Sequence, residues 1–268
     1  MQPFFNVFGI AIPAFFTMTV LAVLVSFSLI LAGTRRSYNR LDAVYYFVVI
    51  LCGAFIGAWV LHTLVNLPRI ISEWQIIRAA MPLASALEYA LLQLSGMVFY
   101  GGLLGGLLAM VGYSRYFKVP LLPYMDLFAP ILLIAHAIGR LGCLFAGCCY
   151  GMAVSERHVF AIFYPPESLV APSGVPLLAV PLIEAVFNLC IAAGIYIFTR
   201  RNTKQGYPTA IYLLTYPAMR FFLEFFRGDV QRGIYFGVST SQWISMGLFA
   251  AGVALLVYIC KQNRGVGA

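Results

Sequence analysis

The sequence predicts an all-α, polytopic membrane protein with about seven transmembrane helices. Three observations support this class: an apolar composition, apolar runs of membrane-spanning length, and basic residues that lie mostly in short connections. Of the 268 residues, 62% are hydrophobic and 10% are charged, whereas a soluble domain carries about 25% charged residues. No polar stretch is long enough for a separate soluble unit, so we expect residues 1–268 to form a single integral membrane domain.

Seven apolar runs each approach the ~20 residues that a helix needs to cross a bilayer. Polar segments rich in Gly, Pro and Arg separate them. The first run is too long for the core of a signal peptide and has no basic leader, so we expect it to be retained as a helix. The predicted spans are residues 9–32, 44–66, 84–113, 121–147, 177–199, 207–226 and 240–260.

The distribution of lysine and arginine predicts a topology with the N-terminus outside and the C-terminus inside. This orientation places ten basic residues in the inner segments and five in the outer ones. The net charge of +8 is therefore a topology signal, and we expect no nucleic-acid partner. The inner set is Arg35, Arg36, Arg40, Arg115, Lys118, Arg200, Arg201, Lys204, Lys261 and Arg264, and the outer set is Arg69, Arg78, Arg157, Arg227 and Arg232.

Charged residues within or beside the spans indicate a functional site, because ionisable groups are rare in the membrane and usually line a cavity. Arg140 lies in the fourth predicted span. Arg220, Glu224 and Arg227 are spaced by four and three residues, which places them on one helical face. Both spans run outward, so we expect all four residues near the outer surface. Arginine suits a phosphate there, since its fork makes two charge-assisted hydrogen bonds at once.

Structural roles for these charges remain open at this stage. Glu184 is an intramembrane carboxylate that needs a partner, and Arg140 could simply be neutralised by Glu184 or Glu224. Glu224 could be a general base, or it could position the arginines on either side of it. Arg227 lies near the predicted membrane surface, where a basic residue is common.

Glycines and a tyrosine in the third span form a second candidate region. Gly101 and Gly105 share a helical face, as small-xxx-small pairs do at close helix contacts, and we expect them to pack helices together. Gly102 and Gly106 are also four residues apart and share a helical face. Tyr100 either points its hydroxyl into a cavity or is an ordinary membrane tyrosine.

Three cysteines follow Arg140 in a glycine-rich segment. Structural zinc sites usually combine four ligands in separated pairs, a pattern that the single cluster of Cys143, Cys148 and Cys149 does not form. We therefore expect no metal ion or other cofactor and favour a packing role for these small side chains. A disulfide or a reactive thiol remains open. His62 and His136 are expected to form hydrogen bonds between helices.

With these motifs in place, most of the chain resembles the prolipoprotein diacylglyceryl transferase family. Several spaced motifs in the right order are more specific than any one alone. The matching elements are Gly102-Leu103-Leu104-Gly105, Gly139-Arg140-Leu141-Gly142 with Gly147 and Gly151, the end of Pro181–Glu184, Arg220-x-x-x-Glu224-x-x-Arg227, and Ser241-Gln242-Trp243.

The resemblance implies a multi-pass enzyme of the bacterial inner membrane that needs no cofactor. It would move the diacylglyceryl group of phosphatidylglycerol to the lipobox cysteine in a prolipoprotein signal peptide and release glycerol phosphate. The lipid bilayer would hold both substrates. The catalytic residues would be Arg140, Arg220, Tyr100 and Glu224, and the substrate-binding residues Arg140, Arg220, Arg227, Gly101, Gly102, Gly139, Gly142, Cys143, Cys148 and Glu184.

Three polar positions depart from the family pattern. Tyr100 stands where the family usually has His, Cys143 replaces its Asn, and Cys148 replaces its Glu. A tyrosine phenol with a pKa of about 10 is a poor base at neutral pH. Two alternatives therefore remain: a relative that acts on another acceptor, and a non-catalytic protein that binds or transports lipid. A small-solute transporter is disfavoured, because the sequence has no paired, broken spans in matching halves.

Overall fold

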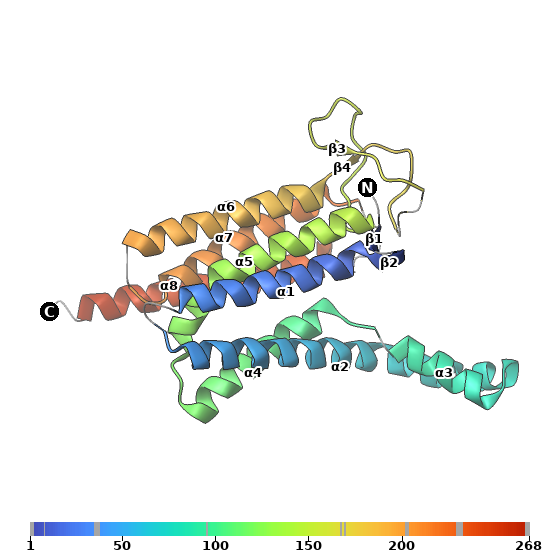
Figure 1. Ribbon diagram of the computed structural model, residues 1–268, viewed down its shortest axis with the longest axis horizontal. Helices are drawn as coiled ribbons and strands as arrows, with labels where there is room; N and C mark the ends of the chain where they lie inside the picture. Colours follow the sequence, from blue (N-terminus) through green and yellow to red (C-terminus); the bar gives the residue numbers. More distant parts are fainter. Residues whose placement is uncertain are drawn as a thin grey trace. The chain divides into compact units, whose positions relative to one another are not determined.

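The computed structural model describes residues 3–7, 9–34, 38–94, 96–166, 168, 170–201, 204–228 and 233–265. The described part is all-α, as the sequence predicts, and it also contains three short hairpins that were not predicted (Figure 1). The chain divides into two compact units: unit 1 is Met1–Gly33 with Leu122–Ala268, and unit 2 is Thr34–Leu121. Arg35, Arg36 and Arg232, which contribute to the topology prediction, lie outside the described residues.

The helices are α1 (Ala14–Gly33), α2 (Arg40–Ala80), α3 (Leu83–Leu94), α4 (Phe99–Phe117), α5 (Leu121–Ala146), α6 (Val180–Arg201), α7 (Tyr207–Leu223) and α8 (Thr240–Gly265), with a 3₁₀ turn, η1 (Glu224–Phe226). The antiparallel hairpins are β1 (Phe4–Val7) with β2 (Ile10–Pro13), β3 (Ala161–Ile162) with β4 (Leu177–Leu178), and β5 (Ile234–Tyr235) with β6 (Val238–Ser239).

Five helices of the described part are long and apolar enough to cross a membrane. They are Ala14–Gly33, Arg40–Ala80, Leu121–Ala146, Val180–Arg200 and Thr240–Gln262. Helix α7 has 17 residues and continues into η1. The count of seven spans and the orientation of the chain stay predictions.

Two of the predicted span boundaries are wrong. The span expected over 84–113 is interrupted, because α3 ends at Leu94 and α4 begins at Phe99. His62 of α2 lies against Gly96 in this break, and its Nε2 is 2.9 Å from the carbonyl oxygen of Gln93. This contact satisfies one of the carbonyls that a helix end leaves without an intrahelical partner. It also confirms the interhelical hydrogen bond expected of His62.

The second error concerns the span expected to end at residue 66. Helix α2 continues through Pro68 to Ala80 and has 41 residues. At about 1.5 Å per residue this is roughly 60 Å, about twice the thickness of the bilayer core. The exposed pair Arg69–Glu73 lies in the continuing segment, with Nε and Oε1 3.0 Å apart at helical i,i+4 spacing.

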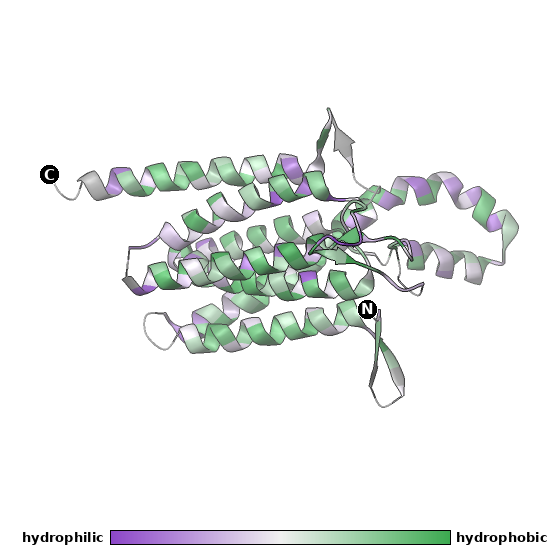
Figure 2. Ribbon diagram, turned by 90° about the horizontal axis from the view of Figure 1, so that it is seen from above, coloured by the Kyte–Doolittle hydropathy of each residue, from purple (hydrophilic) through white to green (hydrophobic). Residues whose placement is uncertain are grey.

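Unit 1 is a bundle in which α1, α5, α6, α7 and α8 run side by side (Figures 1 and 2). Large apolar side chains such as Leu24, Ile197 and Phe222 are exposed on its outside. Charged and polar groups lie in the interior, where Glu184 is only 1% exposed and Asn188 is fully buried. An apolar outside around a polar interior is the arrangement expected in lipid.

Asp126 of α5 fixes where α7 begins. Its Oδ2 accepts a hydrogen bond of 2.6 Å from the Gly206 amide, and its Oδ1 accepts from the Thr209 amide at 3.1 Å and hydroxyl at 2.6 Å. These amides belong to the helix N-terminus, which carries partial positive charge and favours a carboxylate. Asp126 therefore caps α7 and not its own helix.

Unit 2 is held together by glycines of α2 and α4. A Cβ on Gly101 would overlap the carbonyl oxygen of Gly57, and a Cβ on Gly105 would overlap that of Gly53. The packing predicted for Gly101 and Gly105 is confirmed, and Gly53-xxx-Gly57 is the partner motif that the sequence analysis missed. Contacts this close let backbones of membrane helices pack directly.

Replacing Gly105 with Ala is expected to lower the stability of the protein by about 1–3 kcal/mol, because the added methyl group forces α2 and α4 apart. Thermal unfolding of the detergent-solubilised protein measures this. Gly112→Ala in the same helix is the matched control. Its Cβ would meet nothing within 4 Å, so it should be neutral or stabilising by about 0.5–1 kcal/mol. Equal effects of the two substitutions would contradict the glycine contact.

Candidate functional site

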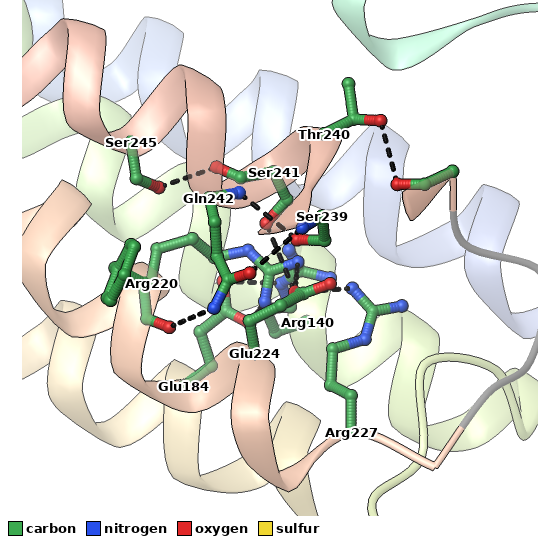
Figure 3. A network of polar contacts seen from close by, with 12 residues as sticks. Arg140, Glu184, Arg220, Glu224, Arg227, Ser239, Thr240, Ser241, Gln242 and Ser245 are labelled. Atoms are coloured by element: carbon green, nitrogen blue, oxygen red, sulfur yellow. Dashed lines mark hydrogen bonds and ion pairs between the residues drawn. The ribbon is translucent and has the colours of Figure 1, made fainter. Parts of the chain in front are cut away.

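Five charged side chains form an alternating network at one end of unit 1 (Figure 3). Glu184 of α6 lies between two arginines: its Oε1 is 2.9 Å from Arg140 Nε, and its Oε2 is 3.8 Å from Arg220 Nη1. Glu224 of η1 also lies between two arginines: its Oε2 is 2.9 Å from Arg220 Nη2 and 3.7 Å from Arg227 Nη1. The order is Arg140–Glu184–Arg220–Glu224–Arg227.

The depth of these charges makes their alternation necessary. The side chains of Glu184 and Glu224 are 2% and 3% exposed, and that of Arg220 is 10% exposed. Removing an ion from water costs several kcal/mol, which only close opposite charges and hydrogen bonds offset. Among the described residues, three guanidiniums face two carboxylates, so this part of the network carries one excess positive charge. An anion would balance it.

The start of α8 fixes Glu224 in place. Ser241 donates a hydrogen bond of 3.1 Å to Glu224 Oε2. Gln242 accepts from the Ser239 amide at 3.0 Å and donates to the Phe221 carbonyl at 3.5 Å. Ser241 and Gln242 belong to a matching motif without a predicted role, and their contacts make them supports of the network (Figure 3).

Two polar residues lie one helical turn away from the charged network, on α5 and α6. The sequence did not predict them as part of the site. Asn188 lies four residues after Glu184, and both of its side-chain polar atoms are buried without a hydrogen-bond partner among the described residues. His136 lies four residues before Arg140, and its Nδ1 is likewise unpartnered there. Its ring centroid is 5.1 Å from that of Tyr216. The spacing of four from predicted site residues was the available signal.

Arg220 also has unused hydrogen-bonding capacity. Its Nη1 is buried and has no hydrogen-bond partner in the described part of the chain, because Glu184 is 3.8 Å away. A buried, unpartnered N–H of a guanidinium costs free energy unless a ligand or water accepts from it. This group and the excess charge both point to an anionic ligand.

An apolar groove lies beside the network, between α7 and α8. Its volume is about 300 Å³. The residues that line it are Pro217, Ala218, Phe221, Phe222, Ser245, Met246, Phe249 and Ala250. The groove therefore offers an apolar surface next to the helices that carry the charges.

The predicted site residues of unit 1 have different surroundings. Arg140, Glu184, Arg220, Glu224 and Arg227 come together as described, so the pairing of Arg140 with Glu184 that the sequence left open is present. A Cβ on Gly139 would meet nothing within 4 Å, and one on Gly142 would lie 3.1 Å from Met18 and 3.3 Å from Phe15 of α1. Gly142 therefore packs α1 against α5.

Tyr100, Gly101 and Gly102 belong to unit 2 and lie in the first turn of α4. Tyr100 is half-buried. Gly101 has the packing contact with Gly57, and a Cβ on Gly102 would lie 3.3 Å from the Ala54 carbonyl oxygen. Their substrate contacts stay predictions.

The cysteines beyond Arg140 converge. The Sγ atoms of Cys143, Cys148 and Cys149 all lie within 4.8 Å of one another, and each thiol is free. Hydrogen bonding with Cys143 and Cys148 lowers the pKa of Cys149, and the charges of Arg227 and Arg140 lower it further. Hydrogen bonding with Cys143 and Cys149 raises the pKa of Cys148.

Comparison with known proteins places these features in a family. The model of the prolipoprotein diacylglyceryl transferase family matches residues 2–258. A protein of Clostridium perfringens named phosphatidylglycerol–prolipoprotein diacylglyceryl transferase 2 is 31% identical over 261 residues, which are 97% of this chain and 95% of that protein. One of Clostridium tetani, named phosphatidylglycerol–prolipoprotein diacylglyceryl transferase, is 28% identical over 262 residues, 97% of each chain.

The chain belongs to the prolipoprotein diacylglyceryl transferase family. It is therefore a transferase and a membrane enzyme, which agrees with its apolar helices. The resemblance inferred from the spaced motifs is confirmed.

Neutralising Glu184 as Glu184→Gln is expected to destabilise the protein by about 3–5 kcal/mol, because it leaves Arg140 and Arg220 buried with too little negative charge. Thermal unfolding in detergent measures the change. Glu73→Gln is the control, since the Arg69–Glu73 pair is exposed and such pairs contribute about 0–1 kcal/mol. A Glu184→Gln variant as stable as the control would contradict the central role of this carboxylate.

Proposed function

We propose that this protein transfers the diacylglyceryl group of phosphatidylglycerol to the lipobox cysteine of a prolipoprotein and releases glycerol phosphate. The single observation that carries the proposal is the alternating network with its excess positive charge and the unpartnered Nη1 of Arg220. Membership of the transferase family and the names of the relatives support the same reaction.

The arginines suit the phosphate of the lipid head group. Arg220 offers a buried N–H group, and Arg140, whose side chain is 20% exposed, offers the N–H groups that do not face Glu184. When the bond from the glyceryl carbon to the phosphate oxygen breaks, negative charge grows on the leaving glycerol phosphate. Donors already held in place stabilise that charge without reorganising. In this mechanism Glu184 and Glu224 orient the arginines, and Arg227 binds substrate.

The remaining parts of the lipid have chemically matching surfaces. An acyl chain suits the apolar groove of about 300 Å³ between α7 and α8, since lipid pockets are mostly apolar with a few polar groups. The unpartnered amide of Asn188 is suited to the hydroxyl groups of the glycerol head. Gly139, with open space beside it, leaves room for substrate next to Arg140.

The proposal includes the membrane placement inferred from the sequence. The protein would cross the bacterial inner membrane about seven times as one domain, with its N-terminus outside, and the charged network would face the outer leaflet. Tyr100 would take part in the reacting region, and Cys143 and Cys148 in substrate binding. Tyr100→Phe tests the hydroxyl, because a lipid-transfer rate equal to that of the wild type would remove Tyr100 from the catalytic set.

The changed polar positions favour an alternative in which the acceptor differs. Tyr100, Cys143 and Cys148 stand where the family usually has His, Asn and Glu, whereas the arginines and Glu224 are retained. Head-group binding would then persist while another molecule receives the diacylglyceryl group.

The purified protein with labelled phosphatidylglycerol and a lipobox peptide tests both versions. We expect release of glycerol phosphate together with a lipidated peptide. Release without peptide lipidation would identify a different acceptor. Neither product, with the lipid still bound, would overturn the proposed enzyme activity and indicate a non-catalytic lipid-binding protein.

Arg140→Ala and Arg220→Ala are each expected to reduce lipid turnover by about 10²- to 10³-fold, the loss typical of removing a preorganised donor to developing negative charge. The rate of glycerol phosphate release measures this at saturating lipid. Arg157→Ala is the control, because Arg157 is an exposed loop arginine. Normal turnover in both network variants would contradict the assignment of Arg140 and Arg220 to the catalytic site.

Asn188→Leu separates a structural from a substrate-binding role. Leucine removes the unpartnered buried amide, so stability should stay the same or rise by about 1 kcal/mol. Turnover should fall if the amide binds the head group, with the loss seen mainly in KM. A variant with unchanged kinetics would remove Asn188 from the substrate site.

A further inference from the structure

The end of α5 brings three thiols together through a local backbone motif. Gly147 has a φ of 70°. The amide of Cys148 donates a hydrogen bond of 3.1 Å to the carbonyl oxygen of Cys143, five residues earlier. A left-handed glycine with this hydrogen bond is the Schellman ending of a helix, which places the residue after the glycine against the one five positions before it. Here these two residues are Cys148 and Cys143.

The next residue completes the cluster. Cys149 has a φ of 58°, a left-handed conformation that is uncommon for a residue other than glycine. This second left-handed turn brings its thiol back toward the other two, and all three Sγ atoms lie within 4.8 Å of one another. The backbone is therefore held in an unfavourable conformation that gathers the thiols.

The spacing suits a thiolate-bound metal ion. Zinc–sulfur bonds are about 2.3 Å long, so three sulfurs around one ion lie roughly 3.8–4.0 Å apart. The three Sγ atoms lie within 4.8 Å of one another. Each pair needs to approach by at most about 1 Å to reach the spacing around a zinc ion. The sequence pattern alone favoured packing because it lacks separated ligand pairs, and the three-dimensional arrangement changes that assessment.

The surroundings suit a metal that keeps one position open. Cys143 is buried, while Cys148 and Cys149 are half-buried, so one side of the cluster is accessible. Arg140 and Arg227 are close enough to Cys149 to interact with it electrostatically, which offsets the negative charge of three thiolates around a divalent ion. The buried Tyr164 hydroxyl has no hydrogen-bond partner among the described residues and interacts electrostatically with all three thiols.

We propose that Cys143, Cys148 and Cys149 bind a zinc ion whose fourth position receives the acceptor thiol of the substrate. Three protein ligands with one open position are the arrangement of catalytic zinc sites. The second half of this inference rests on the proposed transferase function. It gives the two cysteines that replace the family's Asn and Glu a chemical role, and a zinc-bound thiolate needs no histidine base.

The acceptor thiol binds zinc and releases its proton to water. Its sulfur then donates an electron pair to the glyceryl carbon of the lipid, and a carbon–sulfur bond forms as the carbon–oxygen bond to phosphate breaks. That electron pair leaves on the phosphate oxygen of glycerol phosphate, which the arginines stabilise. The neutral thioether is a weak zinc ligand and dissociates.

Metal content of the full-length protein tests the site itself. The protein is purified in detergent with a phosphine reductant and no chelator, and zinc is measured by elemental mass spectrometry. We expect about one zinc per chain, and loss of most of it in Cys143→Ser, Cys148→Ser and Cys149→Ser. The control is the triple variant Cys52→Ser, Cys190→Ser, Cys260→Ser, because these free cysteines are exposed and outside the cluster.

Cadmium in place of zinc reports on the ligands directly. The ultraviolet charge-transfer band of the cadmium-loaded wild type should be stronger than that of each single variant and equal to that of the triple control. A lipobox peptide should strengthen the band further, and the same peptide with serine for its cysteine should leave it unchanged. Absence of stoichiometric metal, a disulfide within the cluster, or equal metal content in the cluster variants would overturn the site.

The outcomes separate this inference from the proposed function. An unchanged band with the cysteine peptide would overturn acceptor binding at the metal. Normal lipid transfer by protein stripped of zinc would overturn the zinc-dependent step and leave the proposed function standing. Bound zinc and peptide coordination without any lipid transfer would support the metal site and contradict the proposed transferase reaction.

Discussion

The Glu184 carboxylate is the constraint on which the charged site depends. It lies in the interior of unit 1 between guanidiniums from two other helices, 2.9 Å from Arg140 and 3.8 Å from Arg220. Buried arginines repel one another and lose their hydration, so they can coexist at this depth only around such a carboxylate. Because the described part of the network holds two carboxylates and three guanidiniums, it is short of one negative charge. In the proposed function the phosphate of the lipid head group supplies that charge, which links the stability of the bundle to its chemistry.

Contacts at both ends of the bundle keep the charges in register. Asp126 caps the first turn of α7 and thereby sets how far along the bundle Arg220 lies. At the other end, Ser241 of α8 binds Glu224, and the Gly151–Arg227 bridge joins the segment after the cysteines to the segment after η1. The thiol cluster is part of this same end, so its chemistry and that of the arginines belong to one region.

The sequence predicted the membrane class, the spaced arginine motif and the close packing of Gly101 and Gly105, because charges and glycines in apolar runs have few physical explanations. It did not predict the break after Leu94 or the extension of α2 to Ala80. At the break after Leu94 the hydropathy hardly changes, and the tertiary contact of His62 with the end of α3 marks the boundary. In α2, by contrast, Pro68 and the charges of Arg69 and Glu73 indicate a connection, yet the helix continues through them. Asn188 and the convergence of the thiols were missed because both depend on which helix faces meet, and sequence spacing alone does not give this.

A structure of the protein with phosphatidylglycerol bound tests the central claim most directly. The account predicts that the lipid phosphate lies within hydrogen-bond distance of Arg220 Nη1 and of the Arg140 guanidinium, with Glu184 still between the two arginines. A phosphate bound elsewhere, with Arg220 Nη1 still unpartnered, would contradict the account. The network would then be a purely structural solution to buried charge.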